Sequence, residues 1–218
     1  MNTAELLQAE NKGMIVAPAG YGKTYLIAEA VVNFGKEREL ILTHTHAGVS
    51  SIKRKILAMS PLKRNFQVET IDGFILRYVL NYPKTSQWTG SIDEIEWDQV
   101  RKCGIHIFKE IFIKDVIRNS YAGLYVDEYQ DCCSEQHTII LELASILPTR
   151  VLGDPLQGIF DFGSNTIVDW DNDVKKTFKE VAILNKPWRW DRINNSDLGN
   201  WLGDVRTNLL NLEKRVTV

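Results

Sequence analysis

The sequence predicts an α/β fold in which helices cover both faces of a parallel β-sheet. Short apolar runs alternate with helix-length segments whose apolar residues recur at helical spacing. Runs that are apolar throughout favour a parallel sheet, because both faces of such a sheet are buried. The runs expected to form strands are Met14 to Ala17, Leu40 to Thr43, Phe66 to Glu69, Leu124 to Asp127, Arg150 to Gly153 and Val181 to Leu184.

One segment interrupts this alternation. Residues 81–120 contain Pro83, Gly90 and two tryptophans, and they carry two helical patterns without an apolar run between them. A chain of 218 residues is long enough for one large domain with a small insertion. We therefore predict one sheet domain formed by residues 1–80 and 121–218, with residues 81–120 as an inserted helical subdomain.

The composition is that of a soluble globular protein, with 44% hydrophobic and 25% charged residues. No apolar stretch approaches the roughly 18 residues that span a membrane, and the N-terminus lacks a basic region followed by an apolar core. Cys103 stands alone and Cys132 adjoins Cys133, which gives neither a disulfide framework nor zinc-ligand spacing. We expect a cytoplasmic protein with reduced thiols and no membrane partner.

The net charge of −2 excludes binding of nucleic acid through a global basic excess. A nucleic-acid site would have to be local. The best local candidate is one cluster of basic residues, although a charge run of this size is more often a solvated helix face. The cluster consists of Lys53, Arg54, Lys55, Lys63 and Arg64.

A glycine-rich turn follows the first expected strand. Gly20 and Gly22 allow the backbone to point several N–H groups at phosphate oxygens, next to the N-terminus of the following helix. Lys23 would reach the outer phosphates, and the Thr24 hydroxyl would be a ligand of Mg²⁺. A turn that merely closes a strand is the alternative. The predicted phosphate-binding residues are Ala17, Pro18, Ala19, Gly20, Tyr21, Gly22, Lys23 and Thr24.

A second motif ends the fourth expected strand, where Asp127 and Glu128 follow an apolar run. Asp127 would hold Mg²⁺ through water, and Glu128 would polarise the water that attacks the terminal phosphate. Alternatively, the two carboxylates cap the helix that begins near Ser134. Because Lys23 and Thr24 are present, we favour a site that binds a nucleoside triphosphate with Mg²⁺ and hydrolyses the triphosphate.

The run from Asp127 to Asp131 resembles the Asp-Glu-aromatic-Gln-Asp box of superfamily 1 DNA helicases of the UvrD/Rep type. The turn fits as well, since that family often begins it with Ala, as at Ala17. The segment from Leu152 to Phe160 resembles the Gly-Asp-Pro-x-Gln box of the family. The resemblance implies a RecA-like P-loop NTPase, the first motor domain of a helicase. It also implies that Gln157 senses the terminal phosphate.

The segment from Leu184 to Arg189 resembles a further box of the family, which ends in Asn-Tyr-Arg. By this resemblance Trp188 stacks on adenine and Arg189 contacts the terminal phosphate. Tyr25 stands where the family has an arginine on the other side of the base, so Tyr25 and Trp188 would enclose adenine. The alternative for Trp188 is a place in the core.

Weaker matches concern single-stranded DNA. The segment from Thr43 to Ala47 stands where the family has Thr-x-Thr-Asn-Lys, and Thr70 to Phe74 where it has Thr-Phe-His. In these segments His46 replaces Asn, Ala47 replaces Lys and Asp72 replaces His, so contacts are changed and a negative charge is added. Phe162 stands where a tryptophan packs against a base, with simple packing as its alternative. The candidate nucleic-acid contacts are Thr45, His46, Asp72 and Phe162.

Three functions fit these motifs. The favoured one is the first motor domain of a UvrD/Rep-like helicase, which needs a second RecA-like domain or a partner chain to move along single-stranded DNA. The second is an ATP-gated interaction module that regulates a partner such as a nuclease. The third is a P-loop kinase or other NTPase unrelated to DNA, which Gln130, Asp131 and Gln157 disfavour.

Overall fold

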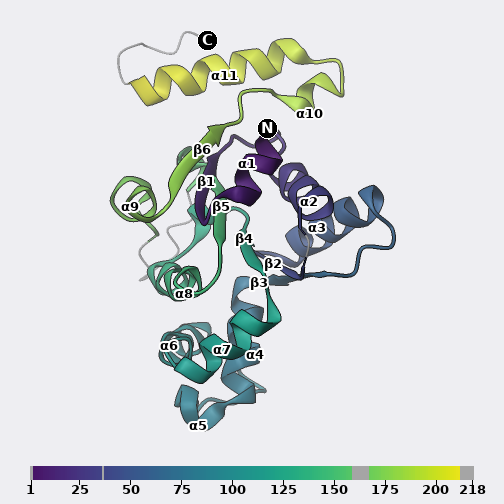
Figure 1. The fold of residues 1–218 in the computed structure, drawn as a ribbon. Coiled ribbons are helices and arrows are strands. Elements are labelled where there is room, and N and C mark those ends of the chain that lie inside the picture. Colours follow the sequence, from purple (N-terminus) through teal and green to yellow (C-terminus); the bar gives the residue numbers. More distant parts are fainter. Residues whose placement is uncertain (1, 36, 159–166, 212–218) are drawn as a thin grey trace.

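The chain forms a six-stranded, parallel β-sheet with the strand order β3-β2-β4-β5-β1-β6 (Figure 1). The computed structural model describes residues 2–35, 37–158 and 167–211. The predicted α/β fold and all six predicted strands are confirmed. The strands are β1 (Lys12–Val16), β2 (Glu39–Thr43), β3 (Phe66–Thr70), β4 (Gly123–Val126), β5 (Thr149–Gly153) and β6 (Lys179–Ile183).

The connections between strands are largely helical. Thr45 and Thr70 begin the helices after β2 and β3, each accepting a hydrogen bond from the backbone N–H three residues later. The helices are α1 (Thr3–Ala9), α2 (Lys23–Asn33), α3 (His46–Met59), α4 (Ile71–Asn81), α5 (Pro83–Ser86), α6 (Trp97–Ile107), α7 (Ile111–Ser120), α8 (Ser134–Ala144), α9 (Lys175–Thr177), α10 (Trp188–Asp191) and α11 (Ser196–Asn211). Short 3-10 helices span Tyr129–Asp131 and Pro155–Gln157, and a π-helical turn spans Trp170–Val174.

The four inner strands β2, β4, β5 and β1 send alternate side chains into two separate apolar cores. In β1, Met14 and Val16 belong to one core, and Ile15 belongs to the other. The first core lies under α4, α6, α7 and α8, while α1, α2 and α3 cover the second. Both faces of the sheet are therefore buried, and the polar ends of the strands are left to form a site (Figure 1).

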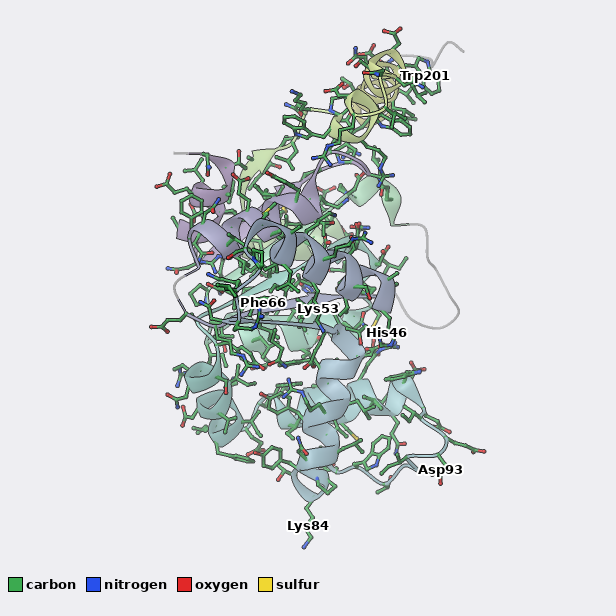
Figure 2. All side chains as sticks on the ribbon, turned by 90° about the vertical axis from the view of Figure 1, so that its right-hand side faces the viewer. His46, Lys53, Phe66, Lys84, Asp93 and Trp201 are labelled. Atoms are coloured by element: carbon green, nitrogen blue, oxygen red, sulfur yellow. The ribbon has the colours of Figure 1, made fainter. Side chains whose placement is uncertain are left out.

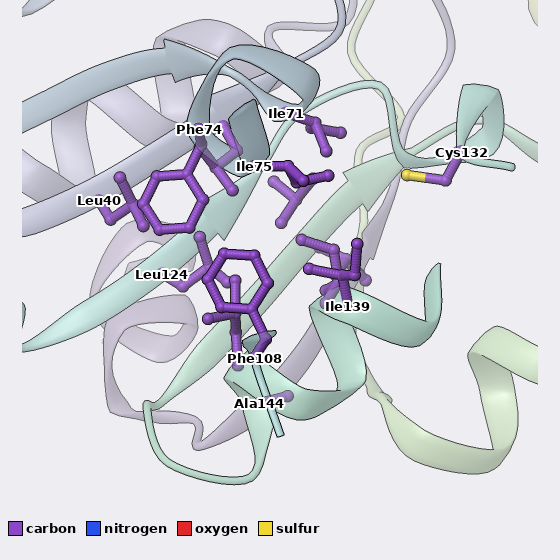
Figure 3. Close-up of a cluster of buried hydrophobic side chains, with 14 of the residues drawn as sticks. Leu40, Ile71, Phe74, Ile75, Phe108, Leu124, Cys132, Ile139 and Ala144 are labelled. Atoms are coloured by element: carbon purple, nitrogen blue, oxygen red, sulfur yellow. The ribbon is translucent and has the colours of Figure 1, made fainter. Parts of the chain in front are cut away.

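The helices of residues 81–120 share the first core with the sheet. Phe108, which follows α6, stacks against Phe74 of α4 with ring centroids 5.7 Å apart (Figure 3). Ile113 and Ile117 of α7 are fully buried in the same cluster. A separate inserted subdomain at residues 81–120 stays a prediction. Among the helices that are described, none combines the length and apolar character needed to cross a bilayer.

Candidate functional site: a phosphate-binding turn and two carboxylates

The glycine-rich turn lies between β1 and α2, as the motif requires. Gly20 and Gly22 have φ angles of 85° and 97°, a backbone region that favours glycine. A Cβ atom at Gly20 would lie 3.0 Å from Cβ of Arg189, whose backbone N–H donates to the Gly20 carbonyl at 3.0 Å. The turn therefore has glycine at two positions where the backbone is left-handed, and it contacts the arginine predicted to bind the terminal phosphate.

Four predicted side chains meet where this turn approaches the end of β4. The ammonium of Lys23 donates to the Ala17 carbonyl at 3.0 Å and lies 3.2 Å from Oε2 of Glu128. The Thr24 hydroxyl donates to Oδ2 of Asp127 at 3.2 Å. Lys23 and Asp127 are buried, with exposed fractions of 5% and 3%. The structure thus brings together residues that are about a hundred positions apart in the sequence.

Glu128 has an unusual backbone conformation. Its φ of 55° and ψ of 46° lie in the left-handed region, which is uncommon for a residue with a side chain. The Glu128 carboxylate is 38% exposed and accepts from the amide of Gln130 at 3.1 Å. The backbone N–H of Glu128 donates to Oδ1 of Asp127 at 3.1 Å. The left-handed backbone at Glu128 therefore places the accessible Glu128 carboxylate next to the buried Asp127 carboxylate.

Burial and, to a smaller extent, the neighbouring Glu128 carboxylate raise the pKa of Asp127 to about 6, although Lys23 and Thr24 oppose the shift. The Asp127 carboxylate and the Thr24 hydroxyl are hard oxygen donors of the kind that Mg²⁺ prefers. A cation bound next to Asp127 would offset the cost of burying its ionised carboxylate. The two side chains therefore fit a site for Mg²⁺ that is completed by water and phosphate oxygens.

A cavity of about 790 Å³ opens beside these residues, which is a size typical of ligand sites. Glu128 and Thr24 both line the cavity. Asp127 is placed next to the cavity by its hydrogen bond with Thr24. Tyr25 and Trp188 are each about half exposed in the cavity wall. The other predicted residues in the wall are Pro18, Ala19, Gly20, Tyr21, Gly22, Lys23 and Arg189.

Two cationic side chains that were not predicted to bind nucleotide also line the cavity: Lys55 from α3, and Arg192. Burial lowers the pKa of Lys55, and Asp127 partly opposes the shift. Lys55 was predicted within a basic nucleic-acid cluster, and the structure divides that cluster. The Lys63 ammonium instead donates to a backbone carbonyl at 2.8 Å, and Arg64 donates to two at 2.9 Å.

Gln157 is not among the residues that line the large cavity. Its side-chain amide donates to Oδ2 of Asp154 at 2.7 Å. It lines a smaller cavity of about 250 Å³ between the glycine-rich turn and α11. The backbone N–H of Asp154 donates to Oε1 of Gln130 at 2.9 Å. Gln157 is therefore linked to the site through Asp154 and Gln130, and its contact with a terminal phosphate stays a prediction.

Three of the candidate nucleic-acid residues, Thr45, His46 and Asp72, lie after β2 and β3, which are neighbours in the sheet. Thr45 and His46 are exposed at the start of α3 (Figure 2). Asp72 accepts from Arg101 at 2.6 and 3.0 Å and from the amide of Gln136 at 2.8 Å, so both its oxygens have partners. Phe162 lies outside the described residues. The DNA contacts of all four stay predictions.

Replacement of Trp188 tests the predicted adenine site. Trp188→Ala is expected to weaken ATP binding about tenfold, because stacking of an aromatic side chain on a base contributes about 1–3 kcal/mol. Isothermal titration calorimetry with ATP and with ADP measures the change. Trp201→Ala is the matched control, since Trp201 is 45% exposed on α11 and is not in the cavity wall (Figure 2). Equal affinities for Trp188→Ala and the unmodified chain would contradict the adenine assignment.

No protein-family model matches the chain. Over 86 residues it is 35% identical to RecBCD enzyme subunit RecB from Buchnera aphidicola subsp. Acyrthosiphon pisum (strain APS), a match that covers 38% of this chain and 7% of RecB. Two structures of Arterivirus nonstructural protein 10 (helicase), with DNA and without it, are 14% identical to the chain, with TM-scores of 0.45 and 0.46. Each match covers 84% of this chain. The matched part is 38% of the viral chain in the complex with DNA and 37% of the viral chain in the other structure. The chain is thus similar to small parts of larger proteins.

Proposed function

We propose that the chain is the ATP-binding and ATP-hydrolysing first motor domain of a UvrD/Rep-like superfamily 1 helicase. The observation that carries the proposal is the convergence of Lys23, Thr24, Asp127 and Glu128 beside a cavity of about 790 Å³. The local sequence match to RecB supports a relation to helicase-type proteins. For translocation on single-stranded DNA, the domain would need a second RecA-like domain or a partner chain.

In the proposed reaction Lys23 changes its partner. In the structure its ammonium lies 3.2 Å from Oε2 of Glu128. A bound triphosphate would attract that ammonium, and Glu128 would then be able to accept a proton from water. The water oxygen bonds to the terminal phosphorus as the bond to the bridging oxygen breaks, and ADP leaves with the electron pair. Lys23 and Arg189 stabilise the charge that develops on the phosphate oxygens.

The metal and base-binding parts of the site complete the proposal. Mg²⁺ bound by Thr24 and Asp127 would supply positive charge next to the phosphates. Tyr25 and Trp188 would hold adenine at the half-exposed wall of the same cavity. Thr45 and His46 would meet single-stranded DNA after the end of β2. The nucleotide and the nucleic acid would therefore occupy neighbouring loops at one edge of the sheet.

An ATP-gated interaction module, for example one that regulates a nuclease, is the second candidate. The observation that favours it is the environment of Asp72, because Arg101 and Gln136 already satisfy the carboxylate that would have to approach DNA. In such a module the nucleotide site would bind ATP with little turnover. The response of hydrolysis to DNA separates the two candidates.

Single-stranded DNA is expected to stimulate ATP hydrolysis by this chain, from a slow basal rate. The basal rate should be slow because, in the proposed function, a second RecA-like domain or partner chain closes over the nucleotide, and neither is added to this assay. A phosphate-release assay with and without a polythymidine strand measures the effect. Lys23→Ala serves as the control for contaminating ATPases, because it removes the lysine from the turn. ATP binding without any response of hydrolysis to DNA would favour the interaction module.

A further inference from the structure

Helix α11 rests on two loops of the nucleotide site. The hydroxyl of Tyr21, in the phosphate-binding turn, donates to the Gly199 carbonyl at 3.4 Å. Nη1 of Arg206 lies 2.6 Å from Oδ1 of Asp154, which directly follows β5. These loops follow β1 and β5, which are adjacent strands. The helix at one end of the molecule in Figure 1 is therefore attached to the centre of the site.

The ion pair between Arg206 and Asp154 is largely buried. The side chain of Arg206 is 15% exposed and that of Asp154 is 1% exposed. Asp154 also accepts from the Leu156 backbone N–H at 3.1 Å and from Gln157 at 2.7 Å. Within residues 2–35, 37–158 and 167–211, Arg206 is the only cationic side chain paired with Asp154. Removal of Arg206 would leave a buried anion without its counter-charge, so the loop would have to move.

A chain of hydrogen bonds continues from Asp154 to the proposed base. The backbone N–H of Asp154 donates to Oε1 of Gln130 at 2.9 Å, and Nε2 of Gln130 donates to Oε2 of Glu128 at 3.1 Å. Gln130 is only 4% exposed, and both ends of its amide are engaged. The position of the loop after β5 therefore fixes the orientation of Gln130, and Gln130 in turn contacts the Glu128 carboxylate.

We propose that Arg206 is a positioning residue for ATP hydrolysis, which acts on Glu128 through Asp154 and Gln130. This inference rests on the proposed function of the site. Among the residues that the structure describes, Glu128 has two side-chain partners, Lys23 and Gln130. When a triphosphate attracts Lys23, Gln130 is the partner that still directs Oε2. A shift of about 1 Å in a reacting group can lower a rate roughly 100-fold, so this contact controls catalysis.

The test combines Arg206→Ala with Gln130→Met. Methionine keeps the length of the glutamine side chain but cannot form the hydrogen bonds of its amide to Asp154 and Glu128. Each single variant is expected to lower kcat roughly 10- to 100-fold, with ATP affinity within about threefold of the unmodified chain. The double variant is expected to be no slower than the slower single variant, because both changes interrupt one connection. Single-turnover hydrolysis and calorimetry give the two quantities.

Arg118→Ala is the matched control. Arg118 also pairs with an aspartate, at 2.7 Å, but both partners are 54% exposed on α7. Its kcat should equal that of the unmodified chain. Losses that multiply in the double variant would overturn the proposal, because they would show that Arg206 does not act through Gln130. An unchanged kcat in Arg206→Ala would overturn it as well.

Arg206→Lys keeps the test decisive if Arg206→Ala does not fold. It retains the positive charge but loses the planar fork, so kcat should fall less than in Arg206→Gln, which has no charge. Equal kcat values for both variants would overturn the proposal. If the unmodified chain does not bind ATP, the proposed function is wrong and this inference falls with it. If the chain binds and hydrolyses ATP but the variants do so equally fast, only this inference is wrong.

Discussion

Glu128→Gln is expected to lower ATP turnover by a factor of roughly 100 to 10,000, the usual contribution of a general base. The amide has nearly the shape of the carboxylate but cannot accept the proton of the attacking water. ATP should remain bound, and its affinity should be equal or higher, because Lys23 loses the anion that lies 3.2 Å from it. Single-turnover hydrolysis and calorimetry measure the two effects separately.

Glu29→Gln is the control for this experiment. Glu29 lines the same cavity, but its carboxylate accepts from Asn2 at 3.4 Å and takes no part in the contacts around Lys23. Its turnover should match that of the unmodified chain. If Glu128→Gln hydrolyses ATP at the unmodified rate, Glu128 is not the base.

Phe74→Ala is expected to lower the free energy of unfolding by about 3–5 kcal/mol, the usual cost of truncating a buried aromatic side chain. Phe74 is fully buried, with its ring centroid 5.1 Å from that of Tyr78 and 5.7 Å from that of Phe108 (Figure 3). Truncation would leave a cavity between α4 and the segment after α6, in the core shared with the sheet. Urea denaturation followed by circular dichroism measures the loss.

The matched control is Phe112→Ala. Phe112 is 43% exposed on α7 and forms an edge contact with Tyr82, with ring centroids 5.5 Å apart. An exposed aromatic pair contributes about 0.5–1.5 kcal/mol beyond its buried area, so the loss should be clearly smaller than for Phe74. Similar losses in the two variants would contradict the expectation that burial of Phe74 in this core sets the larger cost.

The fold could be predicted largely from local patterns. Each strand is a short apolar run, and the turn at Gly20 and Gly22 carries its own backbone preference, so no knowledge of distant contacts was needed. The pairing of Thr24 with Asp127 could be expected as well, because both follow parallel strands whose ends share an edge of the sheet.

The remaining contacts depend on how distant segments pack. Arg206 and Asp154 are 52 residues apart, and no periodicity relates them. The basic run on α3 indicated a charged surface, but only the packing of that helix turns Lys55 towards the cavity. Gln157 was assigned by its place in a motif, and the orientation of its amide toward Asp154 follows from a neighbouring loop.

The left-handed backbone at Glu128 has a consequence for the balance between folding and chemistry. A residue with a side chain pays about 1–3 kcal/mol in such a conformation, whereas glycine adopts it freely. At this position a glycine would therefore favour the folded state but would remove the carboxylate. At position 128, the residue that would best stabilise the fold is therefore not the residue that the proposed chemistry needs. The hydrogen bonds of Glu128 with Asp127 and Gln130 offset the cost of its left-handed backbone.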